Sequence, residues 1–291
     1  MGVGFRSGGG EGGVRKTGNR AHGIGNRIAL TLRFALLTAL MLTIPFASQA
    51  QTADQASAKN SAQARAALSA MVQALGGQAW LTVKNQMRQG KVAAFFHGDP
   101  DPGTTDYLEF HQWPDRDRIE LTKHRDVVQF FIGRQGWEVT YKGNAPLPQV
   151  IVDDWLRRRD HSIETIVKTW LNDPKAILIY DGRRLAGSRL TDQVTVISAE
   201  NESVTIQMDV DTHLPMRRTY EWRDPVYKDM NTDAEEYDDY HLIDGLETPF
   251  TVTRYKNDDM TRQYYLLHIA YNQPLDPDFW SVDAVESRIK K

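Results

Sequence analysis

The stretch DDWLRRRDHSIETIVKTWL, residues 153–171, decides how the rest of the chain is interpreted. On either side of it apolar and polar residues alternate, whereas within it the apolar period lengthens to about 3.6 residues. One side of the resulting helical wheel carries Leu156, Ile163, Val167, Trp170 and Leu171. An amphipathic helical stretch inside a β-rich chain needs a sheet to cover. We therefore expect residues 153–171 to form a helical cover over an antiparallel sheet.

Two helices, rather than one, are expected within this stretch. Asp153 and Ser162 are suitable N-cap residues, because their side-chain oxygens can accept hydrogen bonds from the free N–H groups of a first helical turn. The apolar stripe is interrupted near Asp160, between the two caps. Asn172-Asp173-Pro174 ends the second helix, because proline disfavours helical backbone in the residue before it. The stretch thus predicts a short helical pair broken near Asp160.

Residues on both sides of the helical pair alternate as in half-buried strands. Strands are expected at residues 87–97, 105–113, 116–122, 126–132 and 137–141 before the pair, and at 176–186, 190–199, 203–210, 214–223, 233–243, 247–256 and 261–271 after it. Asp244-Gly245 joins two of these runs, which is a strong signal for a tight hairpin. Strands at this spacing with short connections predict an antiparallel sandwich or barrel in one domain.

The β-rich region has further elements at its ends. An apolar stripe at i, i+3, i+4 and i+7 predicts a helix over residues 57–75, closed by Gly76-Gly77. Trp80 and Leu81 follow it as expected packing anchors. Residues 142–150 are expected to form a loop into the helical pair, and residues 274–280 to cap an edge of the barrel.

The first fifty residues differ in kind from the rest. A long Gly-rich basic segment precedes Phe34–Ala47, an uncharged apolar run of fourteen residues, and Ser48-Gln49-Ala50 then places small residues before a cleavage site near Ala50. The run is shorter than the roughly 20 residues of a membrane-spanning helix, which is the alternative interpretation. We expect residues 1–50 to be a signal peptide and residues 51–291 to be the single domain of an exported, periplasmic protein.

The charge of the expected mature part disfavours polyanionic partners. The whole chain has a formal net charge of −3, and removing six basic residues together with Glu11 lowers it to −8. Nucleic acids are bound through clustered Lys and Arg that neutralise phosphates. We therefore predict no nucleic-acid partner.

Common catalytic and metal-binding motifs are missing from residues 51–291. The histidines are scattered without HExxH or HxH spacing, there is no GxSxG motif, and the chain has no cysteine. The carboxylate-rich segment 229–239 lacks the spacing and the glycine of an EF-hand, so solvated loop charge is the better interpretation. Paired carboxylates for glycoside hydrolysis stay open, because any two strands can bring an Asp and a Glu together. We predict a non-enzyme with no catalytic residue, no metal ligand and no cofactor, with a hydrolase as the less favoured alternative.

Arg157-Arg158-Arg159 is the sharpest charge run of the chain. On a helix three consecutive residues spread over most of a turn, so these cannot all face the apolar side. Two interpretations are open, a solvated face and a contact for an anionic headgroup or for an acidic surface of a partner.

Aromatic residues are numerous, with seven Trp, eleven Tyr and ten Phe in the whole chain, many of them on predicted strands. A small closed barrel fills its interior with such side chains, whereas a half-open one encloses an apolar cavity. Residue by residue an ordinary core is the simpler interpretation. Combined with an amphipathic cover, the same residues also suit a lidded apolar pocket.

The order of these features resembles a known family. A signal peptide, a helix ending in ALGG (residues 74–77), a run of strands, a helical insert and a second run of strands follow one another. The most telling segments are RLAGSRLTDQVTVIS (184–198), VTIQMDVDTHLPMRRTYEW (204–222), DDYHLIDGLETPFTVTRY (238–255) and HIAYNQPLDPDFW (268–280). Together these features resemble the periplasmic lipoprotein-carrier superfamily, the LolA/LolB-like outer-membrane lipoprotein-sorting proteins, over about the whole mature chain.

The resemblance implies a fold of mostly β class with a helical insert, a curved half-open antiparallel β-barrel covered by helices. In such proteins an apolar cavity between helices and concave face takes acyl chains, which would make residues 153–171 a lid. The candidate residues of that cavity are Leu108, Phe110, Val128, Phe130, Ile132, Trp137, Leu156, Ile163, Val167 and Trp170.

The same resemblance implies a non-catalytic periplasmic carrier or sensor. Its expected partners are lipoprotein acyl chains or another lipid, and transient membrane contact and an envelope protein are further candidates. The chain is longer than the typical sorting carrier and has long acidic loops, which leaves the ligand open. The alternative is a regulatory or scaffold binding module whose cavity is filled by its own side chains.

Overall fold

The computed structural model of the protein describes residues 45–289. Most of the predicted signal peptide, residues 1–44, lies outside the described residues. The described residues from Gln55 onward group into one compact unit. Within the described part of the chain, no helix combines the length and the apolar character needed to cross a membrane.

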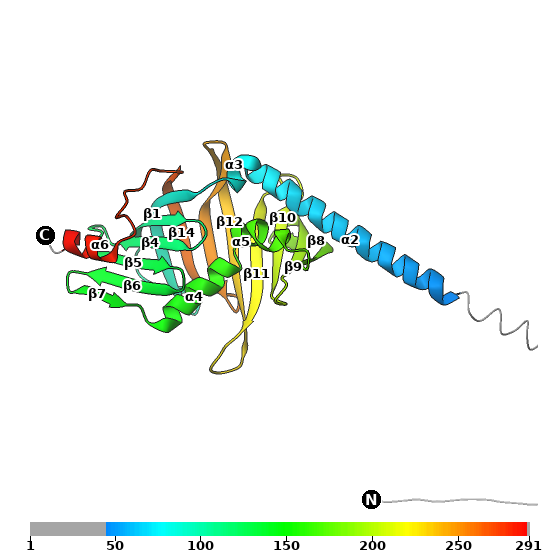
Figure 1. Ribbon diagram of the computed structural model, residues 1–291, viewed down its shortest axis with the longest axis horizontal. Helices are drawn as coiled ribbons and strands as arrows, with labels where there is room; N and C mark the ends of the chain where they lie inside the picture. Colours follow the sequence, from blue (N-terminus) through cyan, green and yellow to red (C-terminus); the bar gives the residue numbers. More distant parts are fainter. Residues whose placement is uncertain (1–44, 290–291) are drawn as a thin grey trace, which may run out of the picture. The chain divides into compact units, whose positions relative to one another are not determined.

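Fourteen strands form one antiparallel sheet (Figure 1). They are β1 Asn85–Phe96, β2 Asp99–Pro100, β3 Thr105–Gln112, β4 Arg116–Leu121, β5 Val127–Ile132, β6 Gln135–Thr140, β7 Gly143–Pro146, β8 Ile177–Ala186, β9 Arg189–Ile197, β10 Ser203–Asp209, β11 Pro215–Arg223, β12 Met230–Ile243, β13 Leu246–Lys256 and β14 Asp259–Tyr271. Each strand predicted from the alternation is present, with ends shifted by a few residues. Two short strands, β2 and β7, replace parts of predicted loops.

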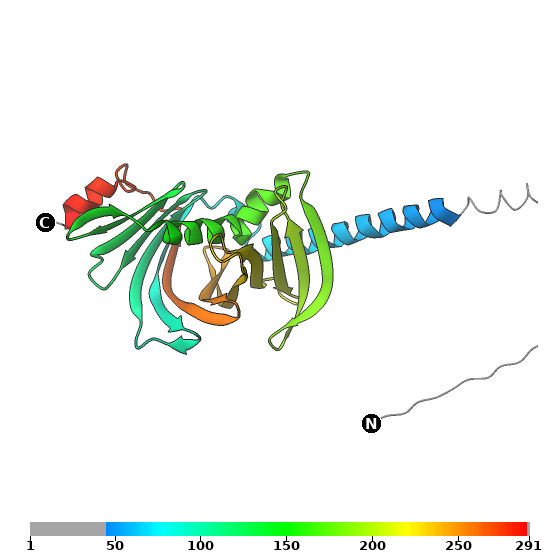
Figure 2. The ribbon, with the colours of Figure 1, turned by 90° about the horizontal axis from the view of Figure 1, so that it is seen from below.

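The strand order shows why the sheet stays open. The strands follow one another as β7-β6-β5-β4-β3-β1-β14-β13-β12-β11-β10-β9-β8, with β2 paired to β1 alone. The two outermost strands, β7 and β8, are neighbours in the chain, and the helical insert joins them. Figure 2 shows the insert passing from one end of the curved sheet to the other along its concave side. The expected mostly β fold, a curved half-open antiparallel barrel covered by helices, is confirmed.

Five helices and one 3₁₀ turn belong to the described residues. They are α2 Pro45–Leu75, α3 Gln78–Leu81, α4 Gln149–Asp160, α5 Ile163–Lys168, η1 Trp170–Asn172 and α6 Val282–Ile289. The predicted break near Asp160 is present, and Ser162 caps α5, because its side-chain oxygen accepts a hydrogen bond from the Thr165 N–H. The prediction that Asp153 caps the first helix is wrong. That helix begins four residues earlier, after Pro148, whose fixed φ suits a helix start.

The main core lies between α2, α5 and the sheet half β8–β11. Met71 of α2, Ile166 of α5, and Val194 and Ile206 of the sheet are fully buried together there. The spacing of Leu68, Met71, Val72 and Leu75 that predicts a helix thus also marks the buried face of that helix. The concave side of this half is closed by packed side chains.

A second, smaller core lies under α4 at the other half of the sheet. Trp155 stacks on Phe131 of β5 with the ring centroids 4.9 Å apart. Val152 and Leu156 of the same helix pack in this cluster. Gly136 allows the close approach of the helix, because an added Cβ would lie 2.9 Å from a methyl group of Val152. The helical insert therefore covers both halves of the concave face.

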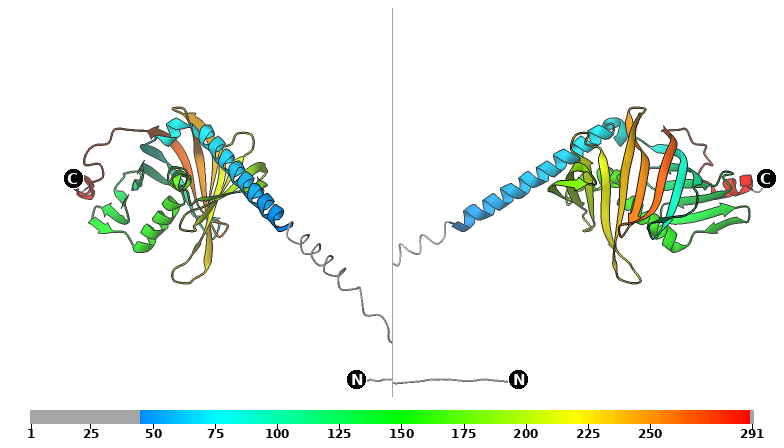
Figure 3. Two further views of the ribbon diagram at one scale, coloured as in Figure 1. Left: turned by 45° about the vertical axis from the view of Figure 1, so that its right-hand side comes forward. Right: turned by 180° about the vertical axis from the view of Figure 1, so that it is seen from behind.

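A third core lies on the opposite, convex face of β5 and β6. Val128, Phe130 and Val139 are fully buried there beneath Val285 of α6. Figure 3 shows α6 beside these strands, at the end of the sheet away from β8–β10. Residues 274–280, predicted to cap a barrel edge, lead into this helix without a strand of their own. The helix itself is not anticipated from the sequence pattern.

A tight turn and a register shift at a glycine fix the register of the central strands. Asp244 and Gly245 both have positive φ, 52° and 80°, and join β12 to β13 as the predicted tight hairpin. In β1 the register shifts between Gln89 and Gly90. A Cβ at Gly90 would lie 2.1 Å from the Tyr265 carbonyl oxygen, so this position, where β1 pairs with β14, requires glycine.

Candidate functional site

The register of the first strands decides which candidate residues share a face. Leu108, Glu120 and Val128 lie side by side on neighbouring strands, and so do Phe110, Arg118 and Phe130. The alternate residues of the same strands, such as Phe131, point to the other face and pack under α4. The strand residues predicted to line the cavity therefore lie on the convex face, away from the helical insert.

The six strand candidates gather around α6. Val128 and Phe130 are sealed in the third core, with Ile132 and Trp137 packed at its margin. Leu108 and Phe110 line a hollow of about 320 Å³ together with Arg118 and Phe279. Arg118 is buried, lies 4.5 Å from the centre of the Phe279 ring and pairs with Glu120. Six of the ten predicted cavity residues thus lie on the face away from the helical insert.

The four candidates on the helical insert lie on the concave side. Leu156 packs under α4, whereas Ile163, Val167 and Trp170 belong to the main core with α2. The ten predicted residues are therefore divided among three clusters and two faces, because alternation tells which residues share a face without telling which face the helices cover. Whether any of them contacts a ligand stays a prediction.

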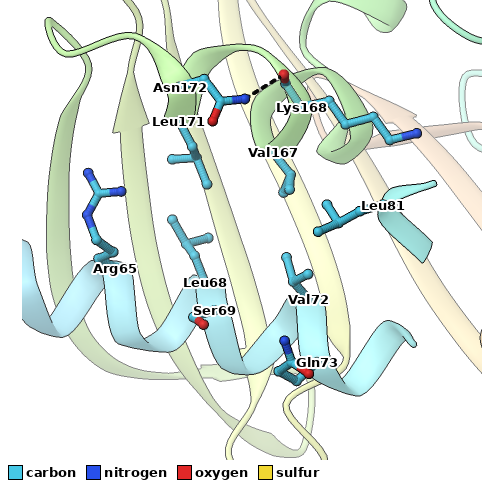
Figure 4. Close-up of a pocket in the computed structure, with 10 residues that line it drawn as sticks. All are labelled: Arg65, Leu68, Ser69, Val72, Gln73, Leu81, Val167, Lys168, Leu171 and Asn172. Atoms are coloured by element: carbon cyan, nitrogen blue, oxygen red, sulfur yellow. Dashed lines mark hydrogen bonds between the residues drawn. The ribbon is translucent and has the colours of Figure 1, made fainter. Parts of the chain in front are cut away.

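A groove of about 620 Å³ lies on the helix side, between α2, α3 and the end of the insert. Leu68, Val72, Leu81, Val167 and Leu171 form its apolar floor, and their side chains point toward one another in Figure 4. The rim is polar, made of Arg65, Ser69, Gln73, Lys168 and Asn172. An apolar floor with a few polar groups at its edge is the usual character of a site for an amphipathic small molecule.

Only Val167 is shared between this groove and the predicted cavity residues. The sequence-based prediction missed the contribution of the N-terminal helix, although Leu68 and Val72 stand out on its apolar stripe. Leu81, expected to be a packing anchor, also lies in the groove. The signal for these residues is present in the sequence, but it does not show that α2 lies beside α5.

A charged cluster around His111 clamps the insert to the sheet. The two ring nitrogens of His111 lie 2.6 Å from Asp117 and 3.1 Å from Glu164 of α5. Burial alone would lower the pKa of His111, but the two carboxylates outweigh it and raise the pKa to about 10. Lys168 pairs with Glu164 at 2.6 Å, and Trp155 donates a hydrogen bond to Asp117. Both α4 and α5 are therefore tied to β3 and β4.

A second cluster ties the insert to the other half of the sheet. Glu235 accepts hydrogen bonds or ion pairs from Arg218 at 2.8 Å and from Arg254 at 2.9 Å. Arg218 also donates to the His161 carbonyl oxygen at 2.5 Å, at the junction of α4 and α5. Burial would raise the pKa of Glu235, but the two arginines hold it well below its ordinary value. The middle of the concave floor is thus charged rather than apolar.

The arginine run on α4 does not form a solvated face. The Arg157 guanidinium lies 3.5 Å from the centre of the Trp222 ring, and Arg159 lies 4.7 Å from that of Trp155 while donating to the Gly133 carbonyl. Arg158 pairs with Asp154 and lies near Arg254 of the sheet. The interpretation of the run as a solvated face is therefore wrong, because the spread of three residues around α4 turns them toward different parts of the sheet. Contact of the run with an anionic headgroup or with an acidic surface of a partner stays a prediction.

No group of three or more His, Cys, Asp or Glu side chains suited to hold a metal ion is present among residues 45–289. The charged clusters consist of arginine–carboxylate and histidine–carboxylate pairs. These pairs hold the insert in place, and the groove beside α2 offers room for a ligand on the helix side.

This architecture defines a class, a curved open antiparallel sheet with helices across its concave face. It is similar to the crystal structure of a DUF1329 family protein from Desulfovibrio piger, with a TM-score of 0.53 and 11% identity over 76% of this chain and 98% of that one. A LolA superfamily protein from Nitrosomonas europaea is also similar, with a TM-score of 0.47 and 12% identity over 74% of this chain and 96% of that one.

At these identities the likeness shows the fold, and of the two matches the one with the Desulfovibrio protein carries that conclusion. The fold expected from the resemblance is confirmed at this level. No family model matches the sequence, and no curated protein matches it.

Proposed function

We propose that the protein is an exported periplasmic carrier or sensor that binds an acyl chain of a lipoprotein or of another lipid. The observation that carries the proposal is the groove of about 620 Å³ with an apolar floor between α2 and the end of the insert. Such binding needs no catalytic residue, metal or cofactor, and the proposal assigns none. Transient contact with the membrane that supplies or receives the lipid follows from it.

The size and lining of the groove support an acyl ligand. Its volume lies within the range of roughly 300–1,000 Å³ that small-molecule sites occupy. Each acyl CH₂ removed from water contributes about 0.8 kcal/mol, so partial burial of a chain gives useful affinity. The polar rim, which includes Arg65, suits a headgroup or an acyl carbonyl at the mouth.

The floor of the groove connects it to the main core. Leu68, Val72 and Val167 line the groove and also pack in the core between the helices and β8–β11. A ligand that moves α5 away from α2 would therefore reach further apolar surface below. A longer chain can be accommodated in this way.

A substitution at the rim tests the proposal. Ser69→Trp places a large ring at an exposed position of α2 that lines the groove, so it should obstruct the groove without disturbing the core. Uptake of a fluorescent fatty-acid probe should weaken by at least about tenfold with little change in Tm. Gln63→Trp, exposed on α2 and outside the groove, is the matched control and should leave uptake unchanged.

Bound material provides a second test. The mature protein should be purified from its host under mild conditions and examined by native mass spectrometry for lipid-sized adducts. Protein that is reproducibly lipid-free and also fails to take up the acyl probe would overturn the proposal.

A regulatory or scaffold binding module is the second candidate. The charged middle of the concave floor favours it, because Arg218 and Glu235 hold the insert closed and a wide apolar cavity is not formed there. This candidate predicts a stable complex with an envelope protein that forms equally well with delipidated protein and with Ser69→Trp. Loss of the complex on delipidation would favour the carrier.

A further inference from the structure

The hollow on the convex face, beside α6, has a buried guanidinium group in its wall. Its volume is about 320 Å³, at the lower end of the range of small-molecule sites. Arg118 of β4 belongs to its lining and is only 3% exposed. The lining shares no residue with the groove beside α2, so the hollow is a separate place for a ligand. Its apolar lining residues are Leu108, Phe110, Phe279, Ala284 and Val285.

One hydrogen-bond donor of Arg118 is unused. Its Nη1 group donates to the Phe279 carbonyl oxygen at 2.8 Å, and its Nη2 group donates to Glu120. The Arg118 Nε group is buried and has no hydrogen-bond partner among the described residues. Burying a donor without an acceptor is costly, and such donors are rare in folded proteins. A ligand that brings an acceptor oxygen to this group removes that cost.

The charge next to this donor favours an anion. Glu120 is buried and pairs with both Arg118 and Arg288, the second at 3.4 Å. One carboxylate therefore faces two guanidinium groups, which leaves one excess positive charge. Burial lowers the pKa of Arg118, because the surroundings solvate its charge poorly. A second carboxylate, supplied by a ligand, would balance the excess.

Apolar surface surrounds the charged group. The centre of the Phe279 ring lies 4.5 Å from the Arg118 guanidinium, and this ring meets Phe110 edge to face at 4.7 Å. Leu108 and Val285, both buried, line the hollow beside them. Such a wall favours the flat or branched apolar body of a small ligand over a bare inorganic ion.

We propose that the hollow beside α6 binds a small organic acid, with its carboxylate on Arg118 and its apolar body against Leu108 and Phe279. The Arg118 Nε group donates to a carboxylate oxygen of the ligand, which is one of the stronger hydrogen bonds available to a protein. The pair of Arg118 and Glu120 stays in place. This site does not depend on acyl binding in the groove, so either proposal can fail alone.

Saturation-transfer NMR with benzoate tests the class of ligand. Benzyl alcohol keeps the ring without the carboxylate, and acetate keeps the carboxylate without the ring. Benzoate should bind about tenfold or more tightly than either probe, because it alone satisfies both parts of the hollow. No binding of benzoate, or equal binding of benzoate and benzyl alcohol, would overturn the proposal.

A substitution on α6 tests the place. Ala284→Phe puts a ring at an exposed position of the lining, so it should weaken benzoate binding by about tenfold or more. Ser287→Phe, exposed on the same helix and outside the lining, is the matched control and should leave binding unchanged. Ser69→Trp in the groove should leave it unchanged too, which separates the two sites. Equal weakening by Ala284→Phe and Ser287→Phe would exclude the hollow.

Arg118→Lys tests the donor itself. Lysine keeps the positive charge but has no Nε group of a guanidinium, so benzoate should bind about tenfold more weakly. Arg118 is buried and paired, so the Tm of this variant is measured beside its binding, and Ala284→Phe keeps the proposal testable if Arg118→Lys does not fold. Wild-type affinity in folded Arg118→Lys would contradict the assigned role.

The exposed charges of the lining, Arg125, Asp276 and Asp278, give predictions of opposite sign. Arg125→Gln should weaken benzoate binding several-fold, because it removes an attractive charge. Asp276→Asn combined with Asp278→Asn should strengthen it several-fold, because two repelling carboxylates are lost. Added salt should reduce both effects. A change of the same sign in both variants would show that the ligand does not bind as an anion.

Discussion

Among single residues, His111 shows how a charged side chain can fix the helical insert to the sheet. It lies between Asp117 of the sheet and Glu164 of the insert, and its pKa is raised to about 10. A histidine in an unfolded chain has a pKa of about 6.5. His111 is therefore protonated in the folded protein at neutral pH, whereas it is mostly neutral in the unfolded chain. Folding takes up a proton there, which links stability to pH.

We predict that this residue makes the protein less stable in alkali. Its contribution is fully present below pH 6.5 and is lost as the pH rises toward 10, because the folded-state pKa is the higher one. The free energy of unfolding, measured by urea titration, should fall by about 3–5 kcal/mol over this window. His111→Gln should remove most of that slope and lower stability at pH 6.5.

The control is His124→Gln, at an exposed position of the loop after β4. It should keep the wild-type slope. Identical pH dependence in wild type and His111→Gln would show that His111 is not the group that titrates.

Among the elements, the boundary between α4 and α5 was the most predictable part of the insert. Ser162 is the cap of α5 in the structure as in the sequence-based prediction, and its side-chain oxygen accepts a hydrogen bond from the Thr165 N–H at 3.1 Å. A helix of six residues has few bonds of its own, so the cap is a large share of its local stability.

We predict that Ser162→Ala lowers the free energy of unfolding by about 1 kcal/mol. The loss should appear as a lower midpoint of urea unfolding with an unchanged m-value. Ser57→Ala, at an exposed position inside α2, serves as the control and should be neutral or slightly stabilising, since alanine is the better helix former. A Ser162→Ala variant as stable as wild type would contradict the capping role.

The last helix shows what the sequence pattern leaves out. Val282, Val285 and Ile289 have helical spacing, but the segment before them is rich in proline and aspartate and resembles a terminal loop. The packing of Val285, with Val282 and Ile289 at its margin, on the convex face of β5 and β6 positions this short helix. A helix of eight residues depends on such tertiary contacts, which its own sequence does not show.

Across the whole molecule, Arg218 links the insert to the second half of the sheet. It joins Glu235 to the carbonyl oxygen of His161, and its side chain is fully buried. Removing one partner of a buried pair leaves the other charge uncompensated. We predict that Arg218→Met lowers the free energy of unfolding by about 3–5 kcal/mol, measured by chemical denaturation.

Two further variants test the coupling. Glu235→Gln added to Arg218→Met should restore part of the loss, because the orphaned carboxylate is then absent. Arg217→Met is the matched control on the opposite face, where Arg217 pairs with Glu236, and it should cost no more than about 1 kcal/mol. Equal losses in Arg217→Met and Arg218→Met would exclude a special role for the concave network.

The molecule as a whole also shows the limit of prediction from alternation. The strand positions, the hairpin at Asp244 and the amphipathic insert follow from local spacing alone. The choice of face does not, since Leu108 and Phe131 are equally apolar and only the tertiary structure places Phe131 under α4. The buried pair of Arg218 and Glu235 could not be predicted either. The two residues lie on different strands, and the alternation within each strand does not show how the strands pair.

One detail at the edge of the sheet determines which helix can move. Asn60 of α2 exchanges two hydrogen bonds with the backbone of Tyr180, at 2.8 and 2.9 Å, and Ser61 donates to the Leu178 carbonyl oxygen at 3.0 Å. These side chains satisfy the free edge of β8 as a further strand would. Movement of α2 away from β8 would expose the backbone N–H and C=O groups of that edge, and exposed edges promote edge-to-edge polymerisation. If the groove widens without exposing this edge, α2 must keep its hydrogen bonds to β8, and α5 and η1 must move away from α2.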